Sequence, residues 1–528
     1  MQIIDNRAVL LKTRNPERYT VIPRSRVVAE LPGGGFEVAV HWGLDEVRVL
    51  RNLGVKSVPS PILGRYDWPG RYRPMQHQRE TASFLTVHRK AFCFNEQGTG
   101  KTLSALWAAD YLMQRGEVRR VLIICPMSIM HTAWLADIGN SIIHRSAIVA
   151  HHKKAERRIE MIQGDYEIVI INYDGIELVA NEIKADGRFD LIIVDEANAY
   201  KGPYTDRWRA LAKIITPKTF LWLMTGTPAA QSPVDAYGLA KLVNPTGVPS
   251  LLSAWRDRVM NKLTMYKWVP KPNAKALVHE ALQPAIRFTK KQCVDLPPVV
   301  TETRNVPMTA QQTKYYKLLR EQMLVMAAGE TISAVNAGVM INKLLQISAG
   351  AAYTENKEVV EFDSTPRLKT LMEVIEETDR KVLVFALFRS CIDTIVRRLA
   401  KANIKADEIH GGVSATRRAR IIDDFQTQPD VRVLVMQPQA TAHGITLTAA
   451  DTVVFYGPLM SVEQYLQCIA RADRVGQNSD KVSVIHIQSS PIEEKLFKSM
   501  SSQVSDHSLL VSMFQDELKG EKRASTTP

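Results

Sequence analysis

The stretch Asn95-Glu96-Gln97-Gly98-Thr99-Gly100-Lys101-Thr102 determines how the rest of the chain is interpreted. It follows an apolar run at 91–94 that is typical of a buried strand, and it precedes 103–113, whose periodicity predicts a helix. A strand, a glycine-bearing loop that ends in Gly-Lys-Thr, and a helix together form a cradle for phosphate groups. The generic pattern has a glycine where Asn95 stands, so the match is one residue short.

Each residue type in this loop suits phosphate binding for a physical reason. Gly98 and Gly100, on either side of Thr99, allow backbone N–H groups to point inward at the phosphates. Lys101 supplies a positive charge for the terminal phosphates, and the Thr102 hydroxyl is suited to hold Mg²⁺. The alternative is a glycine-rich turn with an unrelated lysine, but the flanking strand and helix favour the cradle.

Composition limits the class of protein and its partners. The chain has 528 residues, a length typical of about three domains, and hydrophobic residues make up 45%, which suits well-formed cores. The formal net charge of +13 favours a polyanionic partner, with nucleic acid ahead of a membrane surface. Five scattered cysteines without a Cys-x-x-Cys pair argue against zinc and disulfide frameworks. With no signal peptide or long apolar run evident, we expect a cytoplasmic protein.

The pattern of short segments predicts four regions. Residues 1–70 are expected to form a small β-rich N-terminal module, with strands at 8–11, 19–22 and 36–40 and a proline-containing linker at 59–69. Its basic residues fit either recognition of a DNA substrate or a structural cap on the next domain. Residues 71–285 and 286–500 each alternate strands with helices, which predicts two parallel-sheet α/β lobes. Residues 501–528 are expected to be a tail.

The expected strands locate further polar residues. In the first lobe they are 91–94, 121–125, 168–171, 191–194 and 220–224, and in the second 382–386, 431–436, 452–456 and 482–487. Helices at 309–326 and 333–347 are expected to be insertions. Ligands in such sheets bind at the carboxyl ends of strands, where Asp195-Glu196 stands. Asp195 is suited to hold Mg²⁺ through water, and Glu196 to polarise the attacking water. A helix-capping role is the alternative.

Taken in order, the motifs resemble those of the Swi/Snf-type ATPases of helicase superfamily two, over roughly residues 71–490. Asn95 to Thr102 is similar to that family's Asp-Glu-Met-Gly-Leu-Gly-Lys-Thr loop, which accounts for Asn95 in place of glycine. The family's other motifs are matched by Arg73-Pro74-Met75-Gln76, by Cys125-Pro126-Met127-Ser128 with Trp134, by Asp195 to Asn198, by Met224 to Pro228, by 290–309, by Val382 to Phe385, by Gly444 to Asp451, and by Gln467 to Gln477.

This resemblance implies a fold, cofactors and residue roles. The fold is two RecA-like parallel-sheet lobes with helical insertions, binding ATP and Mg²⁺ between them. Gln76 is then the adenine reader, Gly444 contributes to nucleotide binding, and Arg471 and Arg474 act as arginine fingers on the γ-phosphate. We also expect Arg471 and Arg474 to share one helix face, because they are three residues apart. The small size and the N-terminal module resemble compact phage-encoded or fork-remodelling members.

Two departures from the family pattern affect the functional expectation. Asn198 replaces the usual histidine of the Asp-Glu-x-His motif, and an amide cannot carry charge. The segment 437–442 lacks the Gly-Gly that the family has before Gly444, so a DNA-contacting loop is expected to differ.

We expect a DNA-dependent ATPase that translocates on double-stranded or branched DNA and remodels it. Branch migration, fork reversal and protein displacement are the expected forms of remodelling. Arg389, Arg417 and Arg418 are candidates for a track along the phosphate backbone, with solvated surface charge as their alternative. Two other functions remain open. One is a strand-separating DNA or RNA helicase, and the other is a nucleotide-switched DNA clamp with little turnover, which Asn198 keeps in consideration.

Overall fold

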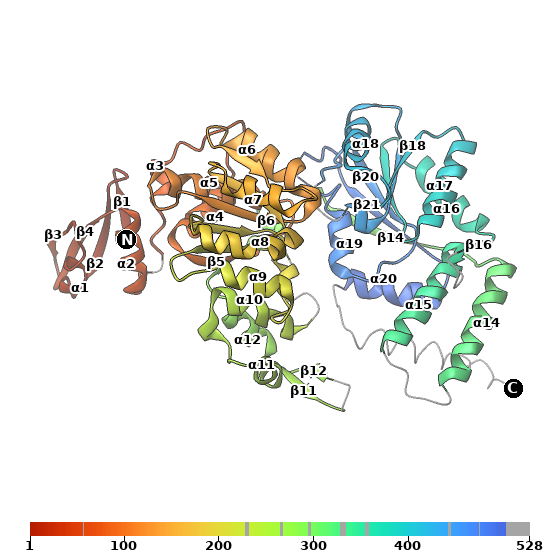
Figure 1. Cartoon of the computed structure of the whole chain (residues 1–528), viewed down its shortest axis with the longest axis horizontal. Helices are drawn as coiled ribbons and strands as arrows, with labels where there is room; N and C mark the ends of the chain where they lie inside the picture. Colours follow the sequence, from red (N-terminus) through yellow and green to blue (C-terminus); the bar gives the residue numbers. More distant parts are fainter. Residues whose placement is uncertain are drawn as a thin grey trace. The chain divides into compact units, whose positions relative to one another are not determined.

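The computed structural model describes residues 1–55, 57–226, 232–264, 268–293, 297–327, 334–353, 358–441, 445–474 and 476–502. These residues fall into two compact units, the first containing most residues up to Cys293 and the second most of those from 297 onward (Figure 1). Each unit is built around a parallel sheet, so the expected pair of α/β lobes is confirmed. Among the described helices we find none with the length and apolar character that a membrane crossing requires.

The first lobe has a seven-stranded parallel sheet in the order β13-β5-β10-β9-β6-β8-β7. Helices cover both faces, which is why the central strands are apolar along their whole length. The strands are β5 (Lys90–Cys93), β6 (Val121–Cys125), β7 (Ala147–Val149), β8 (Ile168–Asn172), β9 (Leu191–Val194), β10 (Phe220–Met224) and β13 (Ala285–Ile286).

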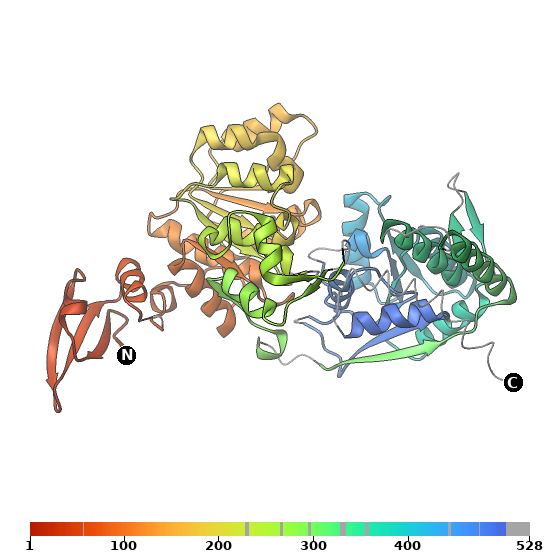
Figure 2. The same ribbon diagram turned by 90° about the horizontal axis from the view of Figure 1, so that it is seen from below.

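The helices of the first lobe form two layers with separate cores (Figures 1 and 2). One core joins α4 (Gln76–Val87) and α5 (Lys101–Gln114) to one face of the sheet. The other joins α7 (Ala155–Gln163), α8 (Tyr173–Asp186), α9 (Asp206–Ile214) and α10 (Ala236–Val243) to the opposite face. The remaining elements are α6 (Ala136–Ser141), α11 (Leu252–Val259), α12 (Ala274–Ala281), α13 (Lys290–Cys293), and the hairpin β11 (Met260–Lys262) and β12 (Trp268–Pro270).

The first lobe extends beyond residue 285, where the sequence pattern divides the two lobes. β13 pairs in parallel with β5, and the compact unit continues to Cys293. A two-residue strand is too short for its pattern to be recognised in a sequence, so the boundary predicted at 285/286 falls inside β13.

The N-terminal residues form a four-stranded antiparallel sheet, in the order β1-β2-β4-β3, as the β-rich expectation requires. The segment predicted as a strand at 19–22 is instead α1 (Glu17–Thr20) and the turn after it, preceded by Pro16, which starts helices readily. The other elements are β1 (Gln2–Ile4), β2 (Ala8–Thr13), β3 (Ser25–Leu31), β4 (Gly35–His41), α2 (Leu44–Asn52) and α3 (Ile62–Arg65).

The proline-containing segment at 59–69, expected to be a linker, is packed on the first lobe. Ser60 is fully buried and its N–H donates to Ser83 Oγ (3.0 Å). At the other end of the segment, Trp107 Nε1 donates to Pro69 O (3.0 Å). The apolar side chains of the N-terminal sheet belong to the same core as α4 and α5. The N-terminal residues therefore pack on the first lobe, and a role in recognising a DNA substrate stays a prediction.

The second lobe has a six-stranded parallel sheet in the order β14-β21-β20-β17-β19-β18. Its strands are β14 (Val299–Asn305), β17 (Lys381–Phe385), β18 (Ala406–Ile409), β19 (Val433–Met436), β20 (Ala450–Phe455) and β21 (Val482–Gln488). Its covering helices are α16 (Thr365–Glu376), α17 (Arg389–Lys401), α18 (Ala415–Thr427), α19 (Val462–Ile469) and α20 (Pro491–Ser501).

The two helices expected as an insertion in the second half are present as α14 (Ala310–Ala327) and α15 (Ala334–Ala349), which pack side by side (Figures 1 and 2). A capping box starts α14: Thr309 N donates to Gln312 Oε1 (3.0 Å), and Gln312 N donates to Thr309 Oγ1 (3.3 Å). A short hairpin of β15 (Ala351–Tyr353) and β16 (Val359–Glu361) follows.

Candidate nucleotide site

The loop after β5 has the conformation that its glycines predict. Gly98 and Gly100 have φ of +82° and +77°, in the left-handed region that glycine adopts without steric cost. Gly100 is the N-cap of α5, so the positive end of that helix points at the loop. Lys101 Nζ donates to the carbonyl oxygens of Asn95 (3.1 Å) and Glu96 (3.3 Å). The lysine thus lies across the mouth of its own loop, where a phosphate group would compete for its donors.

Two polar residues in the first turn of α4 contact the backbone of the loop. His77 Nε2 lies 2.8 Å from Thr99 O, and Gln78 Nε2 donates to the same oxygen (3.4 Å). A Cβ atom at Gly100 would collide with the Gln78 carboxamide, so position 100 needs glycine for close approach as well as for φ. The sequence analysis missed both supports, although two polar residues at the start of an otherwise buried helix were a signal.

Gln76, the predicted adenine reader, is exposed and donates from Nε2 to Glu80 Oε1 (2.7 Å). It lies in the same helical turn as His77 and Gln78, but its hydrogen bond is to Glu80 rather than to the loop, so its role stays a prediction.

The acidic pair follows β9 and meets the loop at one edge of the sheet. In the sheet order, β10 separates β9 from β5, and all three strands are parallel. Gly226, just after β10, is so close to the loop that a Cβ atom there would lie 3.4 Å from Gln97 Cγ. The carboxyl ends of these three strands therefore bring together the phosphate loop, the Asp195-Glu196 pair and the start of the 224–228 motif. Residues 227–228 of that motif lie outside the described residues.

Asp195 is held in place by two hydrogen bonds. Trp134 Nε1 donates to Asp195 Oδ2 (3.0 Å) and Glu196 N donates to Asp195 Oδ1 (3.0 Å). Burial raises the pKa of the Asp195 carboxyl, while the positive charge of Lys101 and these two hydrogen bonds act in the opposite direction. Lys101 begins α5 directly after the loop and Asp195 directly follows β9, so the two opposite charges lie at the same end of the sheet.

Glu196 occupies a backbone conformation that is uncommon for a residue with a side chain. Its φ is +47°, in the left-handed region. Tyr173 OH lies 2.7 Å from Asp195 O and 3.3 Å from Glu196 O, so a half-buried phenol contacts both peptide units. Burial raises the pKa of Tyr173 well above its usual value, which keeps it a hydrogen-bond donor. Asn198 follows in a short 3₁₀ turn (Ala197–Tyr200), where its carbonyl accepts from Lys201 N (3.2 Å).

The side-chain oxygen atoms at the carboxyl ends of these strands suit the coordination of a magnesium ion that also binds a phosphate. Each oxygen of Asp195 accepts one hydrogen bond and keeps a further lone pair, and Thr102, the second residue of α5, supplies a hydroxyl. Mg²⁺ usually retains several waters and takes one or two protein oxygens besides the substrate's phosphates. Within the described part of the chain, no group of three or more His, Cys, Asp and Glu side chains could hold a metal by itself. Thr102 and Asp195 remain the proposed ligands.

In the second lobe, the two predicted arginine fingers come together, but not on a helix face. α19 ends at Ile469, and Ala470 is its C-cap, so Arg471 and Arg474 lie in the turns that follow. The helix-face interpretation is therefore wrong. Both guanidinium groups nevertheless donate to Ile445 O, Arg471 Nη1 at 3.1 Å and Arg474 Nη1 at 3.5 Å. Gly444, predicted to bind nucleotide, lies outside the described residues.

The three arginines considered for a DNA track lie on neighbouring parts of the second lobe. Arg389 begins α17, and Arg417 and Arg418 are in the first turn of α18. The Nη1 atom of Arg389 would lie 3.8 Å from a Cβ atom at Gly412, in the loop that leads into α18. The structure thus gathers three cations at the start of two helices.

Comparison with known proteins identifies the family. Residues 77–350, more than half of the chain, match the family described as SNF2-related domain, and residues 366–476 match the helicase conserved C-terminal domain. The chain therefore belongs to the SNF2-related family, which confirms the resemblance seen in its motifs.

Individual relatives are distant. The mouse protein named chromodomain-helicase-DNA-binding protein 1-like is 24% identical over 486 residues, which are 87% of this chain and 53% of that protein. Putative protein p41 of Acyrthosiphon pisum secondary endosymbiont phage 1 is 22% identical over 420 residues, covering 76% of this chain and 88% of p41. The Sulfolobus solfataricus SWI2/SNF2 ATPase core in complex with double-stranded DNA has 21% identity and a TM-score of 0.42, covering 82% of this chain and 92% of that one. The chain spans about half the length of the mouse relative.

Proposed function

We propose that the protein is a DNA-dependent ATPase that translocates on double-stranded or branched DNA and remodels it. The observation that carries this proposal is the convergence of Lys101, Asp195-Glu196 and Gly226 at one sheet edge, in a chain of the SNF2-related family. Branch migration, fork reversal and displacement of bound proteins are the forms of remodelling that suit movement on a duplex without full strand separation.

In this proposal the residues of the first lobe bind and activate ATP. The loop amides and Lys101 hold the phosphates, and Thr102 and Asp195 hold Mg²⁺, which neutralises charge on the transferred phosphoryl group. Glu196 orients the attacking water, and the brace from Tyr173 fixes the peptide unit from which its side chain projects. Gln76 and Gly444 complete the nucleotide site, as in the family resemblance.

The DNA partner is inferred from charge as well as family. A net charge of +13 and the cations Arg389, Arg417 and Arg418 suit contacts with the phosphate backbone rather than with bases. Binding should then be largely independent of sequence and should weaken steeply as salt is raised. The phage relative supports an origin in a bacteriophage and action in the host cytoplasm.

A clamp with little turnover is the second candidate, because Asn198 stands where the family has a histidine. One experiment separates the two candidates and a strand-separating helicase: ATP turnover measured in parallel with no nucleic acid, single-stranded DNA, duplex, fork, four-way junction and RNA. The proposal predicts strong stimulation by duplex or branched DNA. Negligible turnover with every nucleic acid would favour the clamp, and stimulation only by single strands or RNA would favour the helicase.

A further inference from the structure

The chain segment that leads from the first lobe toward the second runs alongside the phosphate loop. We call residues 284–290 the connector segment. Its strand β13 pairs with β5, and the pairing continues past both strands: Phe94 N donates to Ile286 O (2.8 Å) and Glu96 N donates to Phe288 O (2.9 Å). The connector segment therefore lies against the first two residues of the loop as well as against β5.

Asn95 fastens this contact with its side chain. The residue is fully buried, and its carboxamide bridges two elements. Its Nδ2 donates to Thr81 Oγ1 on α4 (2.8 Å), and its Oδ1 accepts from Phe288 N (3.0 Å). Glycine, which the generic phosphate loop has here, could make neither bond.

Glu96 makes a second side-chain bond to the connector segment. Its Oε2 accepts from Lys290 N at 3.0 Å. Arg287 Nη2 lies 3.8 Å from the other carboxylate oxygen, but both side chains are exposed to solvent, so this ion pair contributes little. The directional bond to the Lys290 amide is the specific part of the contact.

The same two residues touch the lysine expected to bind phosphate. Lys101 Nζ donates to the backbone carbonyls of Asn95 and Glu96. A third link runs through His77, whose ring is 6.0 Å from that of Phe288 and whose Nε2 lies 2.8 Å from Thr99 O. The connector segment is thus joined to the loop by hydrogen bonds, and to His77 of α4, which contacts the loop, by a ring contact.

We propose that Asn95 and Glu96 are positioning residues that join the phosphate loop and the connector segment into one cooperative unit, so that nucleotide binding stabilises the connector segment. This inference rests on the proposed ATP site. The first lobe ends at Cys293 and β14 of the second sheet begins at Val299. Occupancy of the loop is thereby transmitted to the chain that enters the second lobe, through named bonds in the first lobe alone.

The proposal has a quantitative consequence for hydrogen exchange. If the connector segment opens only when the loop opens, a ligand of the closed loop protects both by a factor approaching 1 + [L]/Kd, about 100-fold at 100 times Kd. If the two open independently, the ligand protects only the loop. The degree of protection in the connector segment therefore measures the coupling.

The test is hydrogen exchange by mass spectrometry on the full chain, with and without Mg²⁺-ADP at about 100 times the Kd titrated for each variant. The peptide covering 286–293 reports on the connector segment, and the one covering 95–102 on the loop. The variants form matched pairs: Asn95→Ala against Asn95→Asp, which keeps the acceptor for Phe288 N, and Glu96→Ala against Glu96→Gln, which keeps the acceptor for Lys290 N.

In the parent chain, we expect ADP to slow exchange in both peptides by at least about tenfold. In the two alanine variants the loop peptide should still slow, while the connector peptide should slow by less than about twofold. Glu96→Gln should behave as the parent. Asn95→Asp, which keeps the acceptor for Phe288 N but loses the donor to Thr81 and buries a carboxylate, should retain the slowing of the connector peptide and lower the melting temperature. Slowing of the loop peptide alone in the parent, or unchanged coupling in both alanine variants, would overturn the inference. If ADP binds to no variant and slows neither peptide, the nucleotide site itself is wrong, and the inference fails with it.

Discussion

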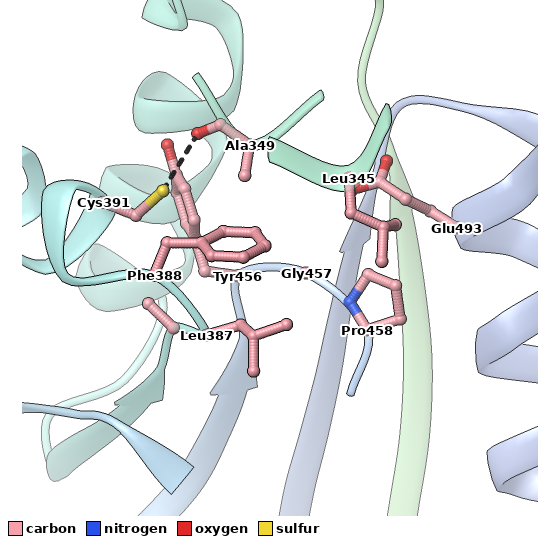
Figure 3. A pocket seen from close by; sticks show the side chains of 10 residues that line it. Leu345, Ala349, Leu387, Phe388, Cys391, Tyr456, Gly457, Pro458 and Glu493 are labelled. Atoms are coloured by element: carbon pink, nitrogen blue, oxygen red, sulfur yellow. Dashed lines mark hydrogen bonds between the residues drawn. The ribbon is translucent and has the colours of Figure 1, made fainter. Parts of the chain in front are cut away.

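In the first lobe β5 leads into a polar loop, whereas in the second lobe β17 leads into an apolar corner. β5 is followed by the glycine-bearing loop and Lys101, whereas β17 is followed by Ala386, Leu387 and Phe388, which close a packed corner (Figure 3). The cavity left there has a volume of about 10 Å³, room for about one water molecule. Its lining also includes Leu345, Ala349, Cys391, Tyr456, Gly457, Pro458 and Glu493.

Burial sets the chemistry of this corner. It raises the pKa of the Cys391 thiol to about 12, and the thiol donates weakly to Ala349 O (3.6 Å; Figure 3). Beside it, Glu493 pairs with Arg367 (2.7 Å), and both side chains are almost fully buried. The residues that follow equivalent strands in the two sheets therefore differ in role. After β17 they form part of the packed core of the second lobe, and after β5 they form the loop proposed to bind phosphate. The role proposed for the second lobe in hydrolysis rests on Arg471 and Arg474.

The largest effect on ATP turnover is expected from replacing Lys101, the lysine of the loop in the first lobe. Lys101→Ala should lower ATP turnover by at least about 10³-fold, because the charge that faces the phosphates is lost, while thermal unfolding should barely change, since the ammonium contacts only carbonyl oxygens. The matched control is Lys381→Ala in the second lobe, whose ammonium also donates to two carbonyls, those of Phe425 and Gln428. Equal turnover in the parent and in Lys101→Ala would remove the phosphate-loop assignment.

The second largest effect on turnover is expected from replacing the arginines of the second lobe. Arg474→Ala should reduce DNA-stimulated turnover by about 10³-fold with a much smaller change in the KM for ATP, because the contact matters mainly in the transition state. Arg474→Lys should rescue poorly, since lysine lacks the planar fork. Arg471 is more deeply buried and its Nε donates to Gln467 O (2.9 Å), so Arg471→Ala should also lower the melting temperature. Parent-like rates in both alanine variants with saturating DNA would contradict this division of labour.

The sequence predicts those features of the two lobes that leave a pattern within a short stretch of neighbouring residues. The central strands follow from continuous apolar runs, and β6, β9 and β10 begin and end where those runs do. The loop follows from residue types at fixed spacing. Edge strands such as β7 and β13 have three and two residues, too few for any period to emerge.

The misses at the site have a common physical reason. The contacts of His77 and Gln78 with the loop, of Trp134 with Asp195, and of Asn95 with Phe288 join residues far apart in the chain. No spacing rule encodes such contacts, because they depend on how α4, the segment after β6 and the connector segment pack on the sheet. The predicted helix face for Arg471 failed for a related reason: where a helix ends is poorly determined by composition alone.

A smaller effect on turnover is expected from removing the hydrogen bond that Trp134 donates to Asp195. Trp134→Phe keeps the ring volume approximately but removes the donor to Asp195 Oδ2, so we expect about a tenfold lower turnover and a higher Mg²⁺ concentration at half-saturation. Trp107→Phe is the control, because that buried indole also donates one hydrogen bond, to Pro69 O (3.0 Å), away from the site. If both variants lose activity equally, with unchanged Mg²⁺ dependence, Trp134 serves only the core.

The smallest expected effect concerns acid stability, to which His88 in the first lobe and His486 in the second contribute. Burial lowers the pKa of His486 in the second lobe and of His88 in the first, each to about 4. A histidine depressed from its usual pKa of about 6.5 stabilises the fold fully above that value, and the contribution is lost as pH falls toward 4. His486→Phe should therefore reduce the pH dependence of the free energy of unfolding between pH 7 and 4, as measured by hydrogen exchange in peptides from the second lobe. His88→Phe should do the same in peptides from the first lobe. An unchanged profile in both variants would show that other groups control acid unfolding.

Displacement of a third strand from a linear duplex tests the central claim most directly, because it reports movement along double-stranded DNA that has no single-stranded tail. The account predicts that the parent chain displaces the third strand with Mg²⁺-ATP, and that neither the parent with a non-hydrolysable ATP analogue nor Lys101→Ala with ATP does so. Duplex-stimulated ATP hydrolysis without displacement of the third strand would contradict translocation on double-stranded DNA.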